Sequence, residues 1–320
     1  MILAAGLSTR LGELGSERPK PLLPVCDWPL IRYSLALLRA HRVRDVIVNT
    51  HHMAELIVDE LQGEVTYSHE RPGILGTGGG VRQAAWFFGG DRCILINGKI
   101  AVDLDLDAVL AHHVRTGALA TLVVRPDAEA ARWGAIDVDE TAGRVRDLRG
   151  SGRHMFVGVH VVEPALIEQL PDGPSDIIEA AYRPALARGD VIGAYVMEGY
   201  FAEHSTPERY LAGNVHLLRG AVVRHPPGEL VGVAADAEVS PKARIIPPVR
   251  IGSGAQVAAG ASIGPDVVIG RRVRVAARVR LERAVVWPDV HVTASASGVI
   301  VTRLRVLPVA TSAPGAPAPR

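Results

Sequence analysis

The first ten residues combine a short apolar run with a small-residue loop that ends on a threonine and an arginine. Ile2-Leu3-Ala4-Ala5-Gly6 leads into Leu7-Ser8-Thr9-Arg10. Small side chains let a backbone approach a bound molecule closely, and the free N–H groups of such a loop can hold phosphate oxygens. Arg10 adds a fixed guanidinium fork that matches phosphate geometry. This pattern predicts a phosphate-binding loop at the end of a first strand.

A second basic loop follows, with the sequence Arg18-Pro19-Lys20-Pro21-Leu22-Leu23-Pro24-Val25. Its prolines fix backbone torsions and so restrict where Lys20 points. A small-residue loop alone often forms an ordinary turn. The two loops in this order and at this spacing are far more specific, and they indicate nucleotide chemistry.

These loops resemble the sugar-1-phosphate nucleotidyltransferases, especially the branch that is similar to mannose-1-phosphate guanylyltransferases. The family pattern reads L-A-[AG]-G-x-G-T-R-L and then R-P-K-P-L-[LV]-P-V. The resemblance continues in order along nearly the whole chain, at Leu75-Gly76-Thr77-Gly78-Gly79, Asn97-Gly98, Trp133-Gly134, Phe156-Val157-Gly158-Val159 and Ser205-Thr206-Pro207-Glu208-Arg209-Tyr210-Leu211.

The resemblance implies that a sugar-1-phosphate oxygen attacks the α-phosphate of an NTP in line and releases pyrophosphate. In such a reaction the protein mainly positions groups and neutralises charge. By resemblance, Arg10 and Lys20 would be catalytic, and Gly134 and Gly158 would line the sugar pocket. The nucleotide-binding residues would be Leu3, Ala4, Ala5, Gly6, Ser8, Thr9, Glu70, Gly76, Thr77, Asn97 and Lys99. The expected partners are a sugar 1-phosphate and an NTP, with a weak preference for GTP, and the expected cofactor is Mg²⁺.

Four departures from the family pattern matter. The mildest is Ser8, which replaces a common Gly of the phosphate loop. Lys99 follows Asn97-Gly98 where the family has an Asp that binds Mg²⁺, and a protonated ammonium cannot be a metal ligand. The Lys of the family's E-K-P, which contacts the sugar phosphate, is missing near Gly150-Ser151-Gly152. Glu203 keeps a carboxylate at the second metal position, one methylene longer than the family's Asp.

Two hypotheses follow from these departures. In the first, the chain is an active Mg²⁺-dependent nucleotidyltransferase in which Lys99 neutralises phosphate and Glu203 holds one Mg²⁺. In the alternative, it is a catalytically weak or inactive homologue that binds a nucleotide or NDP-sugar and regulates or scaffolds a partner enzyme.

Short apolar runs alternate with helical patterns over the first 220 residues, which predicts a mostly parallel sheet covered on both faces. We expect a Rossmann-like α/β nucleotidyltransferase domain over residues 1–222, with a mostly parallel mixed sheet. The expected strands are Met1–Ala5, Asp45–Asn49, Arg92–Ile96, Ala120–Val124 and Met155–Val162. The expected helices are Leu30–His41, Met53–Gln62, Gly79–Trp86, Leu106–Thr116 and Pro207–Arg219.

An aliphatic residue then recurs at every sixth position, at Val233, Val239, Ile245, Ile251, Val257, Ile263, Ile269, Val275 and Leu281. This period is typical of hexapeptide β-helix repeats. It predicts a short left-handed parallel β-helix over residues 223–307, with three coils from nine hexapeptides. The open ends of such a stack favour capping or self-association, so we expect a homo-oligomer. The Pro- and Ala-rich residues 308–320 predict a disordered tail.

Composition excludes several function classes. Lys and Arg total 35 against 34 Asp and Glu, so no net field attracts nucleic acid or an anionic membrane. No apolar run is long enough for a membrane span, and no charged segment precedes an apolar stretch as in a signal peptide, so we expect a cytoplasmic protein. Only two residues precede Leu3, which indicates a clipped first strand.

Other clusters of polar residues are expected to be solvent-exposed and to have no binding role. The arginines between Arg271 and Arg283 are expected to form a solvated face. The pairs His51-His52 and His112-His113 are expected to be solvated residues of a loop or an exposed helix, because adjacent histidines rarely converge on one metal.

Overall fold

The computed structural model describes residues 1–132, 134–148, 150 and 152–310. The described residues form two compact units, and the N-terminal segments are divided between them. The sheet unit comprises Met1–Leu7, Arg18–Pro21 and Ser34–Phe201, whereas the coil unit comprises Ser8–Glu17, Leu22–Tyr33 and the chain from Ala202 onward. The domain boundary expected between residues 222 and 223 stays a prediction. The two compact units do not divide the chain at a single position, because two N-terminal segments belong to the same unit as the C-terminal coils.

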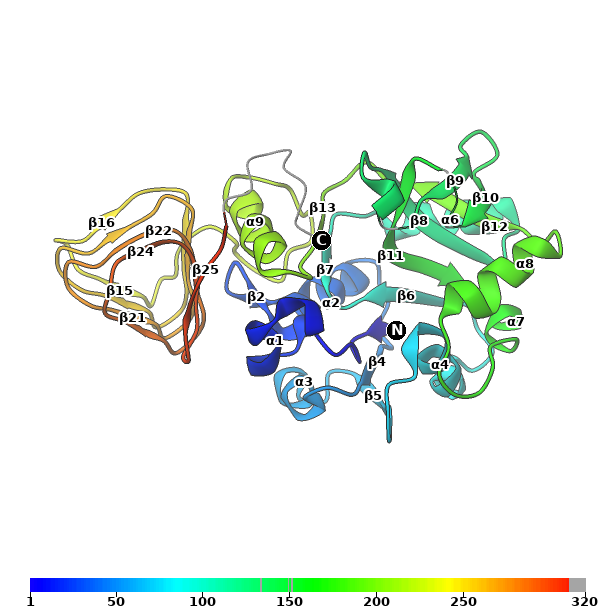
Figure 1. Ribbon diagram of the computed structural model, residues 1–320, viewed down its shortest axis with the longest axis horizontal. Coiled ribbons are helices and arrows are strands. Elements are labelled where there is room, and N and C mark those ends of the chain that lie inside the picture. Colours follow the sequence, from blue (N-terminus) through cyan, green and yellow to red (C-terminus); the bar gives the residue numbers. More distant parts are fainter. Residues whose placement is uncertain (133, 149, 151, 311–320) are drawn as a thin grey trace. The chain divides into compact units, whose positions relative to one another are not determined.

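A mixed sheet forms the centre of the sheet unit (Figure 1). Within the described residues its strands lie in the order β5 (Thr66–His69), β4 (Ile47–Thr50), β1 (Ile2–Leu3), β6 (Cys93–Asn97), β11 (His154–Val162), β8 (Ala120–Pro126), β12 (Ile192–Val196), β10 (Arg144–Leu148) and β9 (Ile136–Asp139). Among these strands, β11 and β10 run opposite to the others. The mixed, mostly parallel α/β sheet predicted from the sequence is therefore confirmed.

Helices follow the strands as the alternating pattern predicts. They are α2 (Leu30–Ala40), whose first turn belongs to the coil unit, α3 (Ala54–Leu61), α4 (Gly76–Gln83), α5 (Ala85–Phe88), α6 (Leu106–Thr116), α7 (Pro164–Ile167), the π-helix η4 (Ile178–Tyr182) and α8 (Arg183–Ala187). Hydrophobic side chains of the sheet pack with those of the helices in one core cluster, which includes Ile47, Leu95, Leu122, Leu166 and Tyr182.

The expectation of a solvated His112-His113 pair is wrong. Helix α6 contacts β8, β11 and β12, and it buries His112 and His113 to 8% and 1% exposure. Burial is tolerated because the imidazoles have partners: His112 Nε2 lies 3.1 Å from the Gly143 carbonyl, and His113 lies 2.8 Å from Thr121 and 2.9 Å from Glu163. Each ring therefore fills a structural position.

Parallel coils make up most of the coil unit (Figure 1, yellow to red). Each residue of one coil pairs with the residue 18 positions later, as in Gly232 with Arg250, Glu238 with Gln256 and Arg244 with Ser262. Eighteen residues are three hexapeptides, so the predicted β-helix is confirmed. Its first coils contain β14 (Gly232–Val233), β15 (Glu238–Val239), β16 (Arg244–Ile245), β17 (Val249–Ile251), β18 (Gln256–Val257), β19 (Ser262–Ile263), β20 (Val267–Ile269), β21 (Arg274–Val275) and β22 (Arg280–Val286).

The coils continue beyond the three that the six-residue period predicts. Strands β23 (His291–Val292), β24 (Ala296–Val301) and β25 (Val306–Pro308) extend the stack. The sequence distance between paired residues shortens here, since Arg274 pairs with His291 and Leu281 with Ala296. The six-residue period therefore does not predict the later coil. Because β25 pairs with β24 and includes Pro308, the first residue of the expected tail belongs to a strand. Residues 311–320 lie outside the described part of the chain.

Five more of the described elements belong wholly to the coil unit, together with most of β13 (Phe201–Glu203). They are the 3-10 helix η1 (Thr9–Leu11), α1 (Glu13–Glu17), the hairpin of β2 (Pro24–Val25) and β3 (Trp28–Pro29), and α9 (Pro207–Leu218). Helix α9 packs against β2, β22 and β24. Among the described residues, no helix combines the length and the hydropathy needed to cross a bilayer.

Candidate functional site

Three strands of the sheet unit end side by side at the edge where the chemistry was predicted. Leu3, the last residue of β1, pairs with Asn49 of β4 and with Asn97 of β6 in parallel register. The Gly98 amide also donates to the Leu3 carbonyl at 2.9 Å. Ligands of open α/β sheets bind beyond the carboxyl ends of their strands. The structure therefore brings the predicted residues Leu3 and Asn97 together at such an edge.

A buried polar chain runs from the loop after β1 to the glycine-rich segment. The Ala4 amide donates to Asn49 Oδ1 at 2.8 Å, and Asn49 Nδ2 donates to Glu70 Oε1 at 2.7 Å. The Leu75 amide donates to Glu70 Oε2 at 2.6 Å. Glu70, which was predicted to recognise the base, is 1% exposed with both oxygens engaged, so it anchors Asn49 and Leu75. Sequence reasoning missed Asn49, although a polar residue at the end of a predicted strand was its signal.

The Gly76-Thr77 segment forms the first turn of α4 and lies against Ser175–Ile177. A Cβ at Gly76, where φ is +71°, would lie 2.6 Å from the Ser175 carbonyl oxygen, so this contact requires glycine. The Gly78 amide donates to the same oxygen at 2.8 Å. The Thr77 hydroxyl accepts from the Ile177 amide at 2.9 Å and donates toward Asp176 at 3.4 Å. The glycine run thus serves packing, and contacts of Thr77 with a base stay a prediction.

Two other predicted glycines have left-handed backbones. Gly158 on β11 has a φ of +84°, and a Cβ there would lie 2.3 Å from Asn97 Nδ2. Asn97 and Gly158 are therefore packed together. Gly134 also has a φ of +84°, whereas Trp133 beside it and Ser151 of the changed E-K-P segment lie outside the described residues.

The two lysines of the prediction are half-buried in the sheet unit. Lys20 begins the 3-10 helix η2 (Lys20–Leu22), and Lys99 occupies the turn between β6 and β7 (Ile100–Val102). The Gly98 amide is hydrogen-bonded to the Leu3 carbonyl at the strand-end edge, and Lys99 is the next residue in the sequence.

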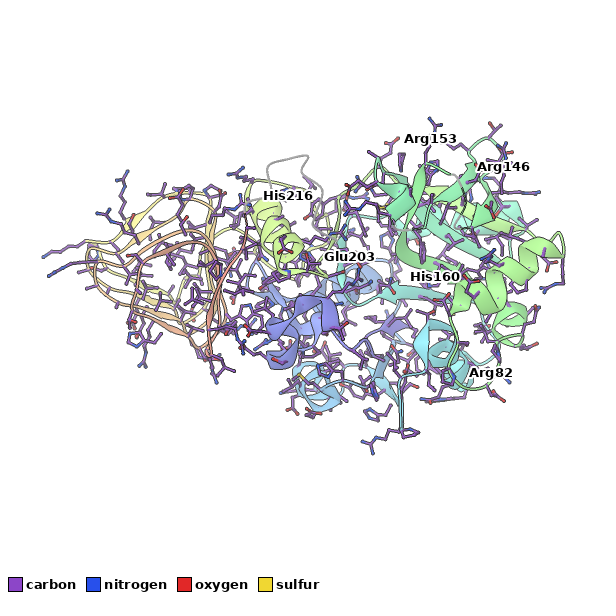
Figure 2. The ribbon with its side chains drawn as sticks, in the orientation of Figure 1. Arg82, Arg146, Arg153, His160, Glu203 and His216 are labelled. Atoms are coloured by element: carbon purple, nitrogen blue, oxygen red, sulfur yellow. The ribbon has the colours of Figure 1, made fainter. Side chains whose placement is uncertain are left out.

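In the coil unit, the second half of the phosphate loop carries the arginine. Ser8 is 2% exposed with a φ of +60°, and Thr9 and Arg10 follow it as exposed residues of η1. Arg10 Nη2 lies 3.7 Å from Glu203 Oε1. Figure 2 labels Glu203, whose other oxygen lies 2.8 Å from Arg209 Nη1. Sequence reasoning quoted Arg209 within the resemblance but assigned it no role.

These contacts do not suit a resident Mg²⁺ ion. A magnesium site needs oxygen ligands, and here the predicted positions provide an ammonium at Lys99 and a carboxylate paired with two guanidiniums at Glu203. One group of possible ligands does converge within the described residues, namely His41, Asp105 and Asp107. Asp105 already caps α6 through the Ala108 amide at 3.0 Å, and His41 is bonded to Asp107.

His204, next to Glu203, adds no charge at neutral pH. Its imidazole is fully buried, and burial lowers its pKa to about 4. Neither ring nitrogen has a hydrogen-bond partner among the described residues. The cationic groups paired with Glu203 are therefore the permanently charged Arg10 and Arg209.

Comparison with known proteins adds family matches to this geometry. Residues 1–149 match the Nucleotidyl transferase family, and residues 231–303 match the GMPPB C-terminal domain. Mannose-1-phosphate guanylyltransferase of Mycobacterium tuberculosis is 29% identical over 69% of this chain and 64% of the relative. UTP–glucose-1-phosphate uridylyltransferase of Synechocystis sp. is 27% identical over 54% of this chain and 51% of the relative. The chain thus spans less than two thirds of the length of these relatives.

Solved structures share the fold. HddC from Yersinia pseudotuberculosis matches with a TM-score of 0.59 and 23% identity, covering 68% of this chain and 97% of that chain. A structure of HddC complexed with GMP-PN matches with a TM-score of 0.58. At this identity the likeness establishes the fold alone.

Proposed function

Because the chain belongs to the nucleotidyl transferase family and has a GMPPB-like C-terminal domain, we propose that it transfers a nucleotidyl group from an NTP to a sugar 1-phosphate, giving an NDP-sugar and pyrophosphate. The observation that carries the proposal is the strand-end edge at which Leu3 pairs with both Asn49 and Asn97. Names of the relatives suggest GTP with mannose 1-phosphate as the first pair and UTP with glucose 1-phosphate as the second.

In this proposal the side chains of the protein neutralise the phosphate charge. Arg10 and Lys20 come from the two signature loops, and Lys99 replaces an acid with a cation beside the strand-end edge. Positioned cations stabilise the charge that develops on transferring phosphoryl groups without reorganisation. Dependence on Mg²⁺ stays a prediction, because the contacts of Glu203 do not suit a resident ion.

A second function is favoured by one observation. Glu203 is paired with Arg10 and Arg209, and Lys99 stands at the other predicted metal position, so two positions typical of metal binding have changed together. A chain altered in this way could bind a nucleotide or NDP-sugar without turnover and regulate or scaffold a partner enzyme.

One experiment separates these proposals. The four NTPs are screened against a panel of sugar 1-phosphates, with release of pyrophosphate as the readout and calorimetric titration of each NTP alongside. Turnover that depends on the sugar 1-phosphate supports the transferase. Nucleotide binding with no pyrophosphate release across the panel supports the binder.

We further propose that the chain is a cytoplasmic protein that self-associates. Exposed aliphatic residues at the first coil support self-association, since Val231 and Val233 are 45% and 43% exposed, whereas later stacked residues such as Ile251 are buried. Light scattering on the purified chain measures the assembly directly.

A further inference from the structure

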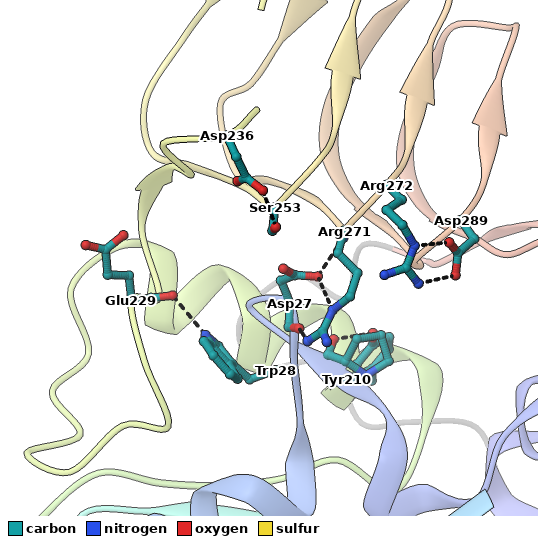
Figure 3. A network of polar contacts seen from close by, with 10 residues as sticks. Asp27, Trp28, Tyr210, Glu229, Asp236, Ser253, Arg271, Arg272 and Asp289 are labelled. Carbon is teal, nitrogen blue, oxygen red and sulfur yellow. Dashed lines mark hydrogen bonds and ion pairs between the residues drawn. The ribbon is translucent and has the colours of Figure 1, made fainter. Parts of the chain in front are cut away.

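The hairpin after the Lys20 loop ends in a turn that is buried against the coils. Its turn residues, Cys26 and Asp27, have φ values of +45° and +71°, and Asp27 is 5% exposed. The Arg271 amide donates to Asp27 Oδ1 at 2.8 Å, and Arg271 Nη2 donates to the Asp27 carbonyl at 3.0 Å (Figure 3). Arg271 comes two residues after β20, so a coil of the β-helix holds both the side chain and the backbone of the turn.

The neighbouring residues fit this turn closely. A Cβ at Gly252 would lie 2.4 Å from Asp27 Oδ2, which means that the coil leaves room for the carboxylate only by having glycine there. The Arg271 guanidinium also lies over the Trp28 ring, 5.9 Å from its centroid. Trp28 Nε1 donates to the Glu229 carbonyl at 3.1 Å, which fixes the other side of the indole.

Helix α9 holds the hairpin from a second direction. The Cys26 amide donates to Asn214 Oδ1 at 2.7 Å, and the Tyr210 hydroxyl donates to the Pro24 carbonyl at 2.6 Å. Tyr210 in turn accepts a bond from Trp287 Nε1 on the coils at 3.1 Å. The position of the hairpin is therefore determined by side chains that are far from it in sequence.

The coils hold the phosphate-loop segment in a similar way. Arg305 Nε lies 2.6 Å from Glu17 Oε1, and Arg305 Nη1 lies 2.5 Å from Glu13 Oε2. Both glutamates belong to α1, which begins three residues after Arg10. Thr302 adds a bond from its hydroxyl to Glu17 at 3.1 Å. Each signature loop is thus followed in sequence by a short element that an arginine of the coils binds.

The expected solvated face holds for Arg272, Arg274, Arg278 and Arg280, which are exposed, whereas Arg271 and Arg283 are half-buried. Arg271 is bound to Asp27, and its neighbour Arg272 is bound to Asp289 with distances of 2.6 and 2.9 Å. The Arg272–Asp289 pair joins two coils, and Asp289 also pairs with Arg303 at 3.1 Å. Arg272 makes no hydrogen bond to the hairpin among the described residues and acts on Asp27 only through its charge, so it provides a control one residue away (Figure 3).

We propose that Asp27, Arg271 and Arg305 are positioning residues for nucleotidyl transfer, because they fix the elements that follow the loops carrying Arg10 and Lys20. The proposal rests on the function proposed above. Reaction rates are sensitive to placement of charged groups on a scale of 1 Å, so loosening either element should lower turnover even though neither arginine touches substrate. The β-helix is then part of the catalytic apparatus.

The test compares Arg271→Ala and Arg305→Ala with the control Arg272→Ala in the full chain. Hydrogen exchange of residues 8–29 reports on the two elements, and kcat, KM and the affinity for NTP report on the site. We expect faster exchange in residues 22–29 for Arg271→Ala and in residues 9–17 for Arg305→Ala. We also expect kcat/KM to fall by about tenfold to a hundredfold in both, mostly through kcat. Arg272→Ala should stay within about twofold of the wild type.

Two conservative variants separate a loss of positioning from a loss of folding. Arg271→Lys and Arg305→Lys keep the charge and should recover part of the lost kcat, whereas a purely structural role predicts a lower melting temperature for the alanine variants with no change in kcat. Faster exchange with unchanged kcat and NTP affinity would overturn the proposal, as would equal behaviour of the three alanine variants. If the wild type shows no turnover, the proposed function fails on its own. NTP affinity and exchange then decide the positioning role separately.

Discussion

Arg209 Nη1 lies 2.8 Å from Glu203 Oε2, and the Glu203 side chain is 13% exposed. The other oxygen of Glu203 faces Arg10 Nη2 at 3.7 Å. One carboxylate thus links α9 to the arginine of the phosphate loop. Because Glu203 is largely shielded from water, its charge is screened less than that of an exposed pair.

This pairing predicts the behaviour of Glu203→Gln, which removes the charge and keeps the size. If the arginines are its partners, losing the carboxylate removes a negative charge that offsets two guanidiniums, and NTP should bind a few times more tightly, on the order of two- to fivefold. The Mg²⁺ concentration for half-maximal turnover should not change. Calorimetry with NTP in EDTA and a Mg²⁺ titration of the rate measure both quantities.

Glu208→Gln is the matched control, since Glu208 is exposed on α9, the helix that carries Arg209. A rise of about tenfold or more in the required Mg²⁺ for Glu203→Gln alone would identify Glu203 as a metal ligand, as the resemblance implied, and would refute the arginine pairing as its main role.

Arg10→Ala should weaken NTP binding and leave the fold intact. The guanidinium is 51% exposed and 3.7 Å from Glu203, so its loss costs little stability. The predicted bond of Arg10 to phosphate would be charge-assisted, and losing it should weaken affinity by about tenfold to a hundredfold. Arg146→Ala, which removes an exposed arginine paired with Asp139, is the control. Equal calorimetric affinities for the two variants would remove Arg10 from the site.

Lys99 separates the transferase from the binder. In the transferase, Lys99 neutralises phosphate in the transition state, so Lys99→Ala should lower kcat by about a hundredfold. Lys99→Asp would restore the carboxylate that the resemblance implies at this position and preserve part of the activity. In the binder, the wild type releases no pyrophosphate and Lys99→Asp gains measurable release. Turnover by the wild type that rises with Mg²⁺ would exclude the binder.

Much of the fold was predictable because its signals are local and periodic. The first strand was expected over Met1–Ala5 and is observed over Ile2–Leu3, and the helix Leu106–Thr116 has the expected bounds and is capped by Asp105. The coils follow from a strict period of six. The period failed after Leu281, where the pairing distance changes and no sequence rule requires a further coil.

The candidate site was predictable only in part, because its polar partners come from distant segments. Motif spacing identified Asn97 and Glu70, but not that Asn49 joins Ala4 to Glu70. Nothing near Asp27 in the sequence indicates that Arg271 will bind it, since 244 positions separate the two. Ion pairs of this kind depend on the tertiary fold, which composition and periodicity do not specify.

Ile263→Asp tests the register of the β-helix. Ile263 is fully buried on β19, so the variant would bury an unpaired charge and lower the free energy of unfolding by several kcal/mol, on the order of 3–5. Ser262→Asp is the control, because the preceding residue of the same strand is half-buried and points to the opposite face. Thermal melting should separate the two variants clearly. Similar melting would contradict the register.

His204 predicts a stability that falls in mild acid. Burial lowers its pKa to about 4 in the folded chain, whereas an unfolded histidine titrates near 6.5. The unfolded chain therefore binds the extra proton between these values, and the stability contributed by neutral His204 is complete above pH 6.5 and is lost as the pH falls toward 4. His204→Leu introduces an apolar side chain of similar size and removes the titrating group.

Urea unfolding of wild type and His204→Leu at pH 7.5 and pH 5 measures this contribution. The wild type should lose about 1–2 kcal/mol more than the variant between these two values. His216→Leu is the control, because His216 belongs to the same unit and its imidazole is exposed. If the stability lost on acidification is the same in His204→Leu as in the wild type, the buried imidazole of His204 is not the acid-sensitive group.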